Sequence, residues 1–208
     1  MQSAKAIQTG KIKSNDVCHT PLHIARLMIA MCKLKEGDRV LDPCRGKNGV
    51  FFNNFPSHTI NDWCEIADDK DFFDYNGTAD IIVSNPPFSL FSKWIDKTLQ
   101  LSPNKICYIF GSLNLTTARL NKFKAAGYGI TALHMFKNTY WYGDAFCVLF
   151  EKGAESLMSL EPTTIMCESC GHRCKRVSPN VCGKGAIAKG LTPPSTPPTA
   201  SGIALNPL

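Results

Sequence analysis

The chain has 208 residues, of which 44% are hydrophobic, and its formal net charge at pH 7 is +6. This length and apolar content support one good hydrophobic core, so we expect one main domain with an appendage rather than two full domains. Apolar stretches stay well short of ~18 residues and the N-terminus lacks the regions of a signal peptide, which predicts a soluble, cytoplasmic protein without a membrane segment. The positive charge is compatible with a polyanionic partner but does not require one.

Cysteine usage divides the chain into two parts. Residues 1–153 alternate between strand-like and helix-like segments and are predicted to form the main α/β domain, whereas residues 154–163 are predicted to be a linker. Four of the ten cysteines follow residue 160. The other six are scattered through the first part and are expected to be reduced thiols in or near the core. They are Cys18, Cys32, Cys44, Cys64, Cys107 and Cys147.

The first predicted helix follows Thr20-Pro21, with threonine expected as the N-cap and proline at the first helical position. This helix, over 22–31, has apolar residues at helical spacing, including both of its methionines, so the methionines are predicted to be core residues.

A strand, a glycine-containing loop and a helix are predicted next. Arg39-Val40-Leu41-Asp42 is predicted to be a short strand, a loop with Pro43 and Gly46 follows, and a helix is predicted over 50–54. Such a unit brings backbone amides and a helix N-terminus to the carboxyl edge of a sheet, where a nucleotide-like ligand can approach closely. A glycine loop alone is weak evidence, because tight turns also need glycine.

Acidic residues follow the next predicted strand, over 59–66. Glu65 lies 23 residues after Asp42, where an acidic side chain at a strand end can accept hydrogen bonds from both ribose hydroxyls. Asp71-Phe72-Phe73 then offers an acceptor for an adenine edge and a ring to pack on adenine. The alternatives are a solvated surface glutamate, a turn aspartate and core phenylalanines.

The tetrapeptide Asn85-Pro86-Pro87-Phe88 follows the apolar run 81–84. Each proline fixes φ, lacks an N–H and favours an extended residue before it, so this loop is predicted to be stiff. The Asn85 side-chain oxygen and the Pro86 carbonyl can accept hydrogen bonds from an exocyclic amino group, and the Phe88 ring offers a face to a flat heterocycle. The alternative is a rigid strand-to-helix turn with a core phenylalanine.

Two helices, a central strand and a final antiparallel pair of strands are predicted to complete the domain. The loop Tyr140-Trp141-Tyr142-Gly143, between the last two strands, either stacks on substrate bases or caps the sheet edge. The predicted helices cover 90–101 and 117–126, and the predicted strands cover 106–110, 130–136 and 145–150.

Taken in order, these motifs resemble the S-adenosylmethionine-dependent adenine-N6 methyltransferases that act on nucleic acid, and they are similar to small members encoded by phages and large viruses. The resemblance covers roughly residues 15–152 and implies an α/β, Rossmann-like methyltransferase fold with a mostly parallel sheet and a terminal antiparallel strand. It implies methyl transfer to the N6 amine of adenine, with DNA favoured over RNA. Because little sequence remains for target recognition, a recognition subunit or a homodimer is an expected partner. The motifs are Thr20-Pro21, Val40-Leu41-Asp42-Pro43 with Gly46, Glu65, Asp71-Phe72 and Asn85-Pro86-Pro87-Phe88.

The same resemblance implies a role for each matched residue. Asp42, Pro43 and Gly46 hold the methionine end of S-adenosylmethionine, and Thr20 with Pro21 closes over it. Glu65 takes the ribose hydroxyls, and Asp71 with Phe72 takes the adenine. Asn85 and Pro86 grip the target amine, and Pro87 and Phe88 complete the catalytic loop. Since Asn85 cannot serve as a general base, rate acceleration is expected to come from positioning and electrostatics.

One residue departs from the family pattern. Asn48 occupies the position of the second glycine after the Asp-Pro pair, and asparagine is the non-glycine residue best able to adopt a positive φ there.

Two other functions remain open. A protein glutamine methyltransferase also uses an Asn-Pro-Pro motif to grip a carboxamide, and a non-catalytic binding subunit would tolerate the change at Asn48.

Four cysteines mark the predicted appendage over 164–184. A Cys-x-x-Cys-Gly turn followed by two further cysteines is typical of a tetrahedral zinc site, with His172 as an alternative ligand to Cys174 and a disulfide as the competing interpretation. Residues 185–208 are rich in proline and small polar residues, without an aromatic or acidic residue, and are predicted to be disordered. The expected ligands of structural Zn²⁺ are Cys167, Cys170, Cys174 and Cys182.

Overall fold

The computed structural model describes residues 19–137, 143–158, 176–178 and 181–182. The chain divides into two units, Met1–Glu161 and Pro162–Leu208. In the second unit the described residues form a short antiparallel pair, β7 (Arg176–Ser178) and β8 (Val181–Cys182). The predicted tail 185–208 and most of the predicted zinc knuckle 164–184 therefore lie outside the described residues.

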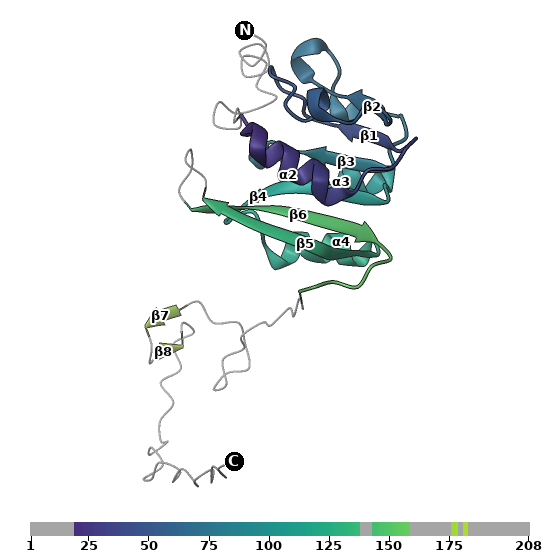
Figure 1. The fold of residues 1–208 in the computed structure, drawn as a ribbon. Helices are drawn as coiled ribbons and strands as arrows, with labels where there is room; N and C mark the ends of the chain where they lie inside the picture. Colours follow the sequence, from purple (N-terminus) through teal and green to yellow (C-terminus); the bar gives the residue numbers. More distant parts are fainter. Residues whose placement is uncertain (1–18, 138–142, 159–175, 179–180, 183–208) are drawn as a thin grey trace, which may run out of the picture. The chain divides into compact units, whose positions relative to one another are not determined.

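A six-stranded mixed sheet, in the order β2-β1-β3-β4-β6-β5, forms the centre of the first unit (Figure 1). The first four strands are parallel, and β6 runs antiparallel to both of its neighbours, which confirms the α/β class with a mostly parallel sheet. The antiparallel strand β6 is the last strand of this sheet in the sequence, but it does not lie at the sheet edge. It pairs with β4 on one side and with the edge strand β5 on the other. The strands are β1 (Arg39–Asp42), β2 (Ile60–Trp63), β3 (Ile81–Ser84), β4 (Lys105–Gly111), β5 (Tyr128–Lys137) and β6 (Asp144–Lys152).

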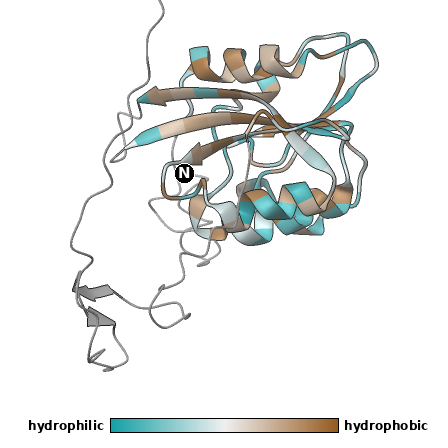
Figure 2. Ribbon diagram, turned by 90° about the horizontal axis from the view of Figure 1, so that it is seen from below, coloured by the Kyte–Doolittle hydropathy of each residue, from teal (hydrophilic) through white to brown (hydrophobic). Residues whose placement is uncertain are grey.

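Strand β4 shows why helices cover both faces of this sheet. Its buried residues alternate between two hydrophobic clusters: Tyr108 and Phe110 pack with helices α3 (Phe91–Leu101) and α4 (Thr117–Ala125), whereas Cys107 packs with helix α2 (Leu22–Cys32). Successive side chains of a strand point to opposite faces, so a continuous apolar strand needs cover on both sides. Figure 1 shows α2 on one face and α3 and α4 on the other, and Figure 2 shows mostly hydrophobic strands between these layers.

The start of α2 differs from the sequence prediction. Pro21, rather than Thr20, is the N-cap, with an extended conformation at φ −60° and ψ 141°. Its carbonyl accepts hydrogen bonds from the backbone N–H groups of Ile24 and Ala25 at 3.0 and 3.1 Å. The fixed φ of proline suits the N-cap as well as the first helical position, so the Thr20-Pro21 pair did not decide between them.

The segment predicted as a helix over 50–54 forms only a single 3-10 turn rather than an α-helix. Turns lead from the glycine loop to a short 3-10 helix, η2 (Phe52–Asn54), which ends at Phe55 because the following proline disfavours a helical conformation there. The side-chain amides of Asn53 and Asn54 donate to the carbonyls of Asn48 and Val50 at 3.0 and 2.9 Å, and such bonds compete with helix formation. The loop therefore presents turn amides rather than a helix N-terminus.

The described cysteines of the first unit form no disulfide, in line with the predicted reduced thiols. Cys32, Cys64, Cys107 and Cys147 are buried and Cys44 is half-buried, whereas Cys18 lies outside the described residues. A search of the described helices finds none that is both long enough and apolar enough to cross a membrane.

Lys33 offers a test of the end of α2. This exposed residue is the C-cap and adopts the left-handed conformation, with φ 49° and ψ 58°. Glycine has no β-carbon to oppose this conformation, so Lys33→Gly is expected to raise the free energy of unfolding by about 0.5–1 kcal/mol in urea denaturation. Lys35→Gly, at an exposed position without a positive φ, is the matched control and should give no gain. An equal gain in both variants would contradict the assignment.

Candidate cofactor and catalytic site

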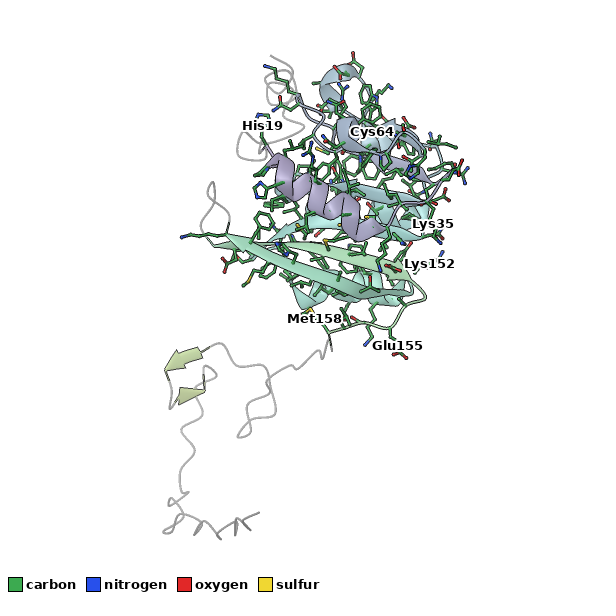
Figure 3. The ribbon with its side chains drawn as sticks, viewed as in Figure 1. His19, Lys35, Cys64, Lys152, Glu155 and Met158 are labelled. Carbon is green, nitrogen blue, oxygen red and sulfur yellow. The ribbon has the colours of Figure 1, made fainter. Side chains whose placement is uncertain are left out.

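The carboxyl ends of β1, β2 and β3 meet at one edge of the sheet. β1 lies between the other two, so the chain connects β1 to β2 on one side and then crosses to β3 on the other. A crevice forms where connections leave in opposite directions, and ligands of open α/β sheets bind there. A cavity of about 790 Å³ lies at this edge, within the usual size range of cofactor sites. His19 lines this cavity, and Figure 3 shows it on the opposite side of the first unit from Lys35 and Lys152.

The cavity brings together most of the residues that the sequence pointed to. The four that do not border it are Pro21, Asp42, Pro86 and Phe88. The eight that line it are Thr20, Pro43, Gly46, Glu65, Asp71, Phe72, Asn85 and Pro87.

Glu65 lies two residues beyond β2 rather than inside the strand. It is the N-cap of the 3-10 helix η3 (Ile66–Asp68), and its Oε1 accepts from the Ala67 N–H at 3.0 Å. Its Oε2 accepts from the Gly46 N–H at 2.7 Å, which ties the carboxylate to the glycine loop. Each carboxylate oxygen has a further lone pair, so Glu65 is held in place and still able to accept ligand hydroxyls.

Aromatic rings surround the cavity next to Asp71. This residue caps the 3-10 helix η4 (Phe72–Asp74), and its Oδ1 accepts from the Phe73 N–H at 3.0 Å. The buried Phe72 ring packs on Trp94 with 4.7 Å between centroids, and Phe73 meets Trp94 edge-on at 5.5 Å. Trp94 lies in the helix predicted over 90–101, but it was not predicted to line a cavity. An acidic acceptor beside apolar rings suits the amino edge and the faces of a heterocycle.

Asn85 follows β3 and borders the cavity. Its Oδ1 is buried and has no hydrogen-bond partner among the described residues. A buried acceptor left in this state costs about 1–3 kcal/mol, so a ligand that donates a hydrogen bond here would complete the site. The buried Pro86 and Pro87 that follow hold the loop extended, with Pro87 at φ −64° and ψ 120°.

Phe88 lies beside the cavity rather than in its wall. It begins the 3-10 helix η5 (Phe88–Leu90), and its ring meets Phe91 edge-on at 6.0 Å. A β-carbon on Gly111, at the end of β4, would come within 3.2 Å of this ring. The sequence offered two alternatives for Phe88, a core residue or a ring that is accessible to a heterocycle. Phe88 is half-buried, so its ring packs on the core on one side and stays partly accessible.

Asp42 is fully buried and lies behind the cavity wall. Its Oδ1 accepts from the Ser84 hydroxyl at 2.8 Å and from the Cys44 N–H at 3.3 Å, whereas its Oδ2 makes no hydrogen bond within ordinary distance and angle limits. Burial raises the pKa of Asp42 to about 7, although Ser84 and the backbone at Cys44 and Phe52 oppose this change. The hydrogen bond from Ser84 was not predicted. A serine at the end of a fully buried strand could have indicated it, because a buried hydroxyl group needs a hydrogen-bond partner.

Solved structures with the same architecture identify the fold. A magnesium protoporphyrin IX methyltransferase from Synechocystis PCC 6803 with bound SAM (S-adenosylmethionine) matches with a TM-score of 0.50 and 14% identity, over 62% of this chain and 76% of that one. A precorrin-6y C5,15-methyltransferase from Geobacter metallireducens GS-15 matches at 0.50 and 12%, over 64% and 90%. The Mtq2–Trm112 complex of E. cuniculi matches at 0.50 and 15%, over 66% and 99%. The fold is that of Rossmann-like methyltransferases.

This likeness is one of fold rather than of sequence. No protein-family model and no curated protein matches the chain.

In this methyltransferase fold, the glycine loop places its positive φ angles on glycines. Gly46 has φ 63° and Gly49 has φ 53°, whereas Asn48 is not among the residues with positive φ. The loop therefore does not use the ability of asparagine to adopt a positive φ. Asparagine at this position lines the cavity without backbone strain.

Most of the predicted zinc ligands and of the aromatic loop lie outside the described residues. Cys167, Cys170 and Cys174 lie outside the described residues, Cys182 lies in β8, and Tyr140-Trp141-Tyr142 also lies outside. Within the described ranges, no group of three or more His, Cys, Asp or Glu side chains is placed to hold a metal ion.

Proposed function

We propose that the chain is an S-adenosylmethionine-dependent methyltransferase that methylates the N6 amine of adenine in nucleic acid, with DNA as the favoured polymer. The observation that carries this proposal is the buried Asn85 Oδ1, which has no partner in the described structure and borders a cavity at the cofactor edge of a methyltransferase fold. An acceptor in this position suits the protons of an amino group.

The residues of the cavity fit the cofactor. Glu65 offers lone pairs to the ribose hydroxyls, and Asp71 beside Phe72 and Trp94 suits the adenine. The turn that contains Pro43 and Gly46 would hold the methionine end. When bound, S-adenosylmethionine supplies an electrophilic methyl group.

The catalytic loop would act by orienting the target amine. The lone pair of an adenine amino group is delocalised into the ring, so this amine is a poor nucleophile. Hydrogen bonds from its two protons to Asn85 Oδ1 and to the Pro86 carbonyl favour a pyramidal nitrogen with its lone pair directed at the cofactor cavity. A stiff loop makes these bonds without reorganisation, which is how positioning and electrostatics lower a barrier.

The charge distribution supports a polyanionic substrate held mainly by the ends of the chain. Residues 1–18 and 159–208 carry eight Lys or Arg residues against three Asp or Glu residues, whereas residues 19–158 carry fifteen against fourteen. Five of the six net positive charges thus belong to the terminal segments. Lysine and arginine in such segments contact phosphates without reading sequence.

A labelled-methyl assay tests this function. The purified chain is incubated with methyl-labelled cofactor and with DNA, RNA or protein, and the expected product is N6-methyladenine in DNA. The protein arm is needed because one structural neighbour is part of a complex responsible for methylation of the eRF1 translation termination factor. Transfer to protein and never to nucleic acid would favour the glutamine methyltransferase alternative. Label in none of the polymers would favour a binding subunit.

We also propose that target recognition uses a second copy of this chain or a separate recognition subunit. The described elements of the first unit, Met1–Glu161, are the methyltransferase sheet and the helices and turns that pack on it. One structural neighbour is likewise a two-protein complex. Light scattering of the chain with and without DNA would measure whether a dimer forms.

Measuring the zinc content of the wild type and of a cysteine variant tests the proposed four-cysteine site. One zinc ion per chain is expected by elemental analysis, and Cys170→Ser should lose it, because three thiolates hold zinc far more weakly than four. Cys44→Ser, which changes a half-buried cysteine of the first unit, is the control and should keep the metal. A chain that purifies without zinc and shows a disulfide among these cysteines would overturn the assignment.

A further inference from the structure

Asp42 is a buried carboxyl group that forms no ion pair with the described residues. Among the described residues, ion pairs join Arg39 to Asp80, Arg45 to Asp68 and Lys122 to Asp96, and none reaches Asp42. Its Oδ1 has two donors, Ser84 and the Cys44 N–H. In the part of the chain that the structure describes, Oδ2 has no donor within ordinary hydrogen-bond geometry, although the nearby Phe52 backbone also lowers the pKa of this carboxyl group. A buried carboxylate in this state is unstable unless positive charge comes near.

The groups around Asp42 do not supply that charge. Glu65, beyond β2, adds negative charge. The thiol of Cys64 has a pKa raised to about 12 by burial, and burial also raises the pKa of Tyr108 on β4, so both are neutral near pH 7. Cys44, on the loop that follows β1, carries no positive charge. Its neighbour Arg45 bonds to Asp68 at 2.6 Å and lies 3.8 Å from the centroid of the Trp63 ring.

We propose that cofactor binding releases one proton from Asp42 to solvent, because S-adenosylmethionine supplies the positive charge that this carboxylate lacks. This inference rests on the proposed function. Pro43, which directly follows Asp42, and Cys44, whose N–H donates to Asp42 Oδ1, both line the cavity, so the carboxylate lies just behind the wall that the cofactor would contact. In a buried region of low effective dielectric, a cation on the other side of such a wall favours the ionised carboxyl group.

The proton linkage has a defined sign. The raised pKa of Asp42, about 7, means that much of the free protein holds this proton at neutral pH. A bound cation lowers that pKa, so affinity for the cofactor should rise about tenfold per pH unit as the pH approaches about 7, and level off above it. Apparent proton release should therefore be largest below pH 7 and vanish at high pH.

Titration calorimetry tests the proposal directly. S-adenosylmethionine is titrated into the full chain in two buffers of different ionisation enthalpy, and the binding enthalpy should differ between them by the amount that proton release predicts. S-adenosylhomocysteine lacks the methyl group and the sulfonium charge, so it should release fewer protons. Binding of S-adenosylmethionine without proton release would overturn this inference alone. Failure to bind either compound at any pH would count against the proposed function as well.

Three variants locate the proton. Asp42→Asn should bind without proton release and with a flat pH dependence. Ser84→Ala should move the rise in affinity to higher pH, because the Ser84 hydrogen bond lowers the pKa of Asp42. His19→Asn changes a titratable residue of the cavity wall and should keep the release. Release that persists in Asp42→Asn, or disappears in His19→Asn, would assign the proton elsewhere; unfolding curves check that each variant is folded.

Discussion

Asn85→Ala is expected to reduce the rate of methyl transfer about 100- to 1000-fold while leaving the affinity for S-adenosylmethionine nearly unchanged. The variant removes an acceptor that would bind the amine most strongly when its nitrogen becomes pyramidal, and losing one such preorganised contact has an effect of this size. The buried Oδ1 makes no hydrogen bond in the described structure, so the substitution removes no internal hydrogen bond of this atom. Initial rates with labelled cofactor and calorimetric dissociation constants measure the two effects separately.

Asn76→Ala is a suitable control for this experiment. Asn76 is exposed, does not line the cavity, and its side chain donates to the Asp74 carbonyl. Its replacement should leave the rate at the wild-type level. An Asn85→Ala protein that is equally active would show that the Asn-Pro-Pro loop only connects β3 to α3.

The second large effect concerns stability and pH. The pKa of Asp42 rises from 3.8 to about 7 in the folded protein, so the folded state keeps a proton that the unfolded chain releases. The stability linked to this group is fully present below about pH 4, falls as the pH rises toward 7, and is lost above it. The total loss is on the order of 4 kcal/mol, since each unit of pKa difference corresponds to about 1.4 kcal/mol.

Urea denaturation of Asp42→Asn tests this expectation. The variant carries no ionisable group at this position, so its stability should exceed that of the wild type at about pH 8, and the difference should shrink toward pH 4. Asp80→Asn is the contrasting control. The Arg39 backbone and side chain bind Asp80 and lower its pKa, so this variant should lose stability at neutral pH. An Asp42→Asn protein less stable than the wild type at pH 8 would contradict the cost assigned to the buried carboxylate.

The sheet could be predicted from sequence because its central strands are short apolar runs. Ile106–Phe110 is buried on both faces, and the segments on either side of it show helical spacing. The short helix after the glycine loop could not be predicted in the same way. Its outcome depended on Pro56 and on side-chain amides of Asn53 and Asn54 that bind backbone carbonyls, and these local bonds outweighed the apolar pattern.

The sequence predicted the site residues that follow strands or turns, but not the contacts between elements that are remote in sequence. Glu65, Asp71 and Asn85 could be identified because they follow apolar strands or turns at characteristic spacing, and parallel strands bring their carboxyl ends together. Trp94 and the Asp42–Ser84 hydrogen bond depend on how α3 and β3 pack against β1, which spacing along the chain does not specify. Contacts between elements remote in sequence are set by tertiary packing.

The Asp42–Ser84 hydrogen bond has a consequence for the order of binding. It joins the ends of β1 and β3, so the loop that would hold the cofactor and the loop that would hold the target amine share one buried contact. Hydrogen bonds to an ionised carboxylate are shorter and stronger than those to a neutral carboxyl group. Cofactor binding that ionises Asp42 would therefore strengthen its hydrogen bond with Ser84, which holds the start of the Asn-Pro-Pro loop. We therefore expect an ordered kinetic pattern in which the cofactor binds before the polymer.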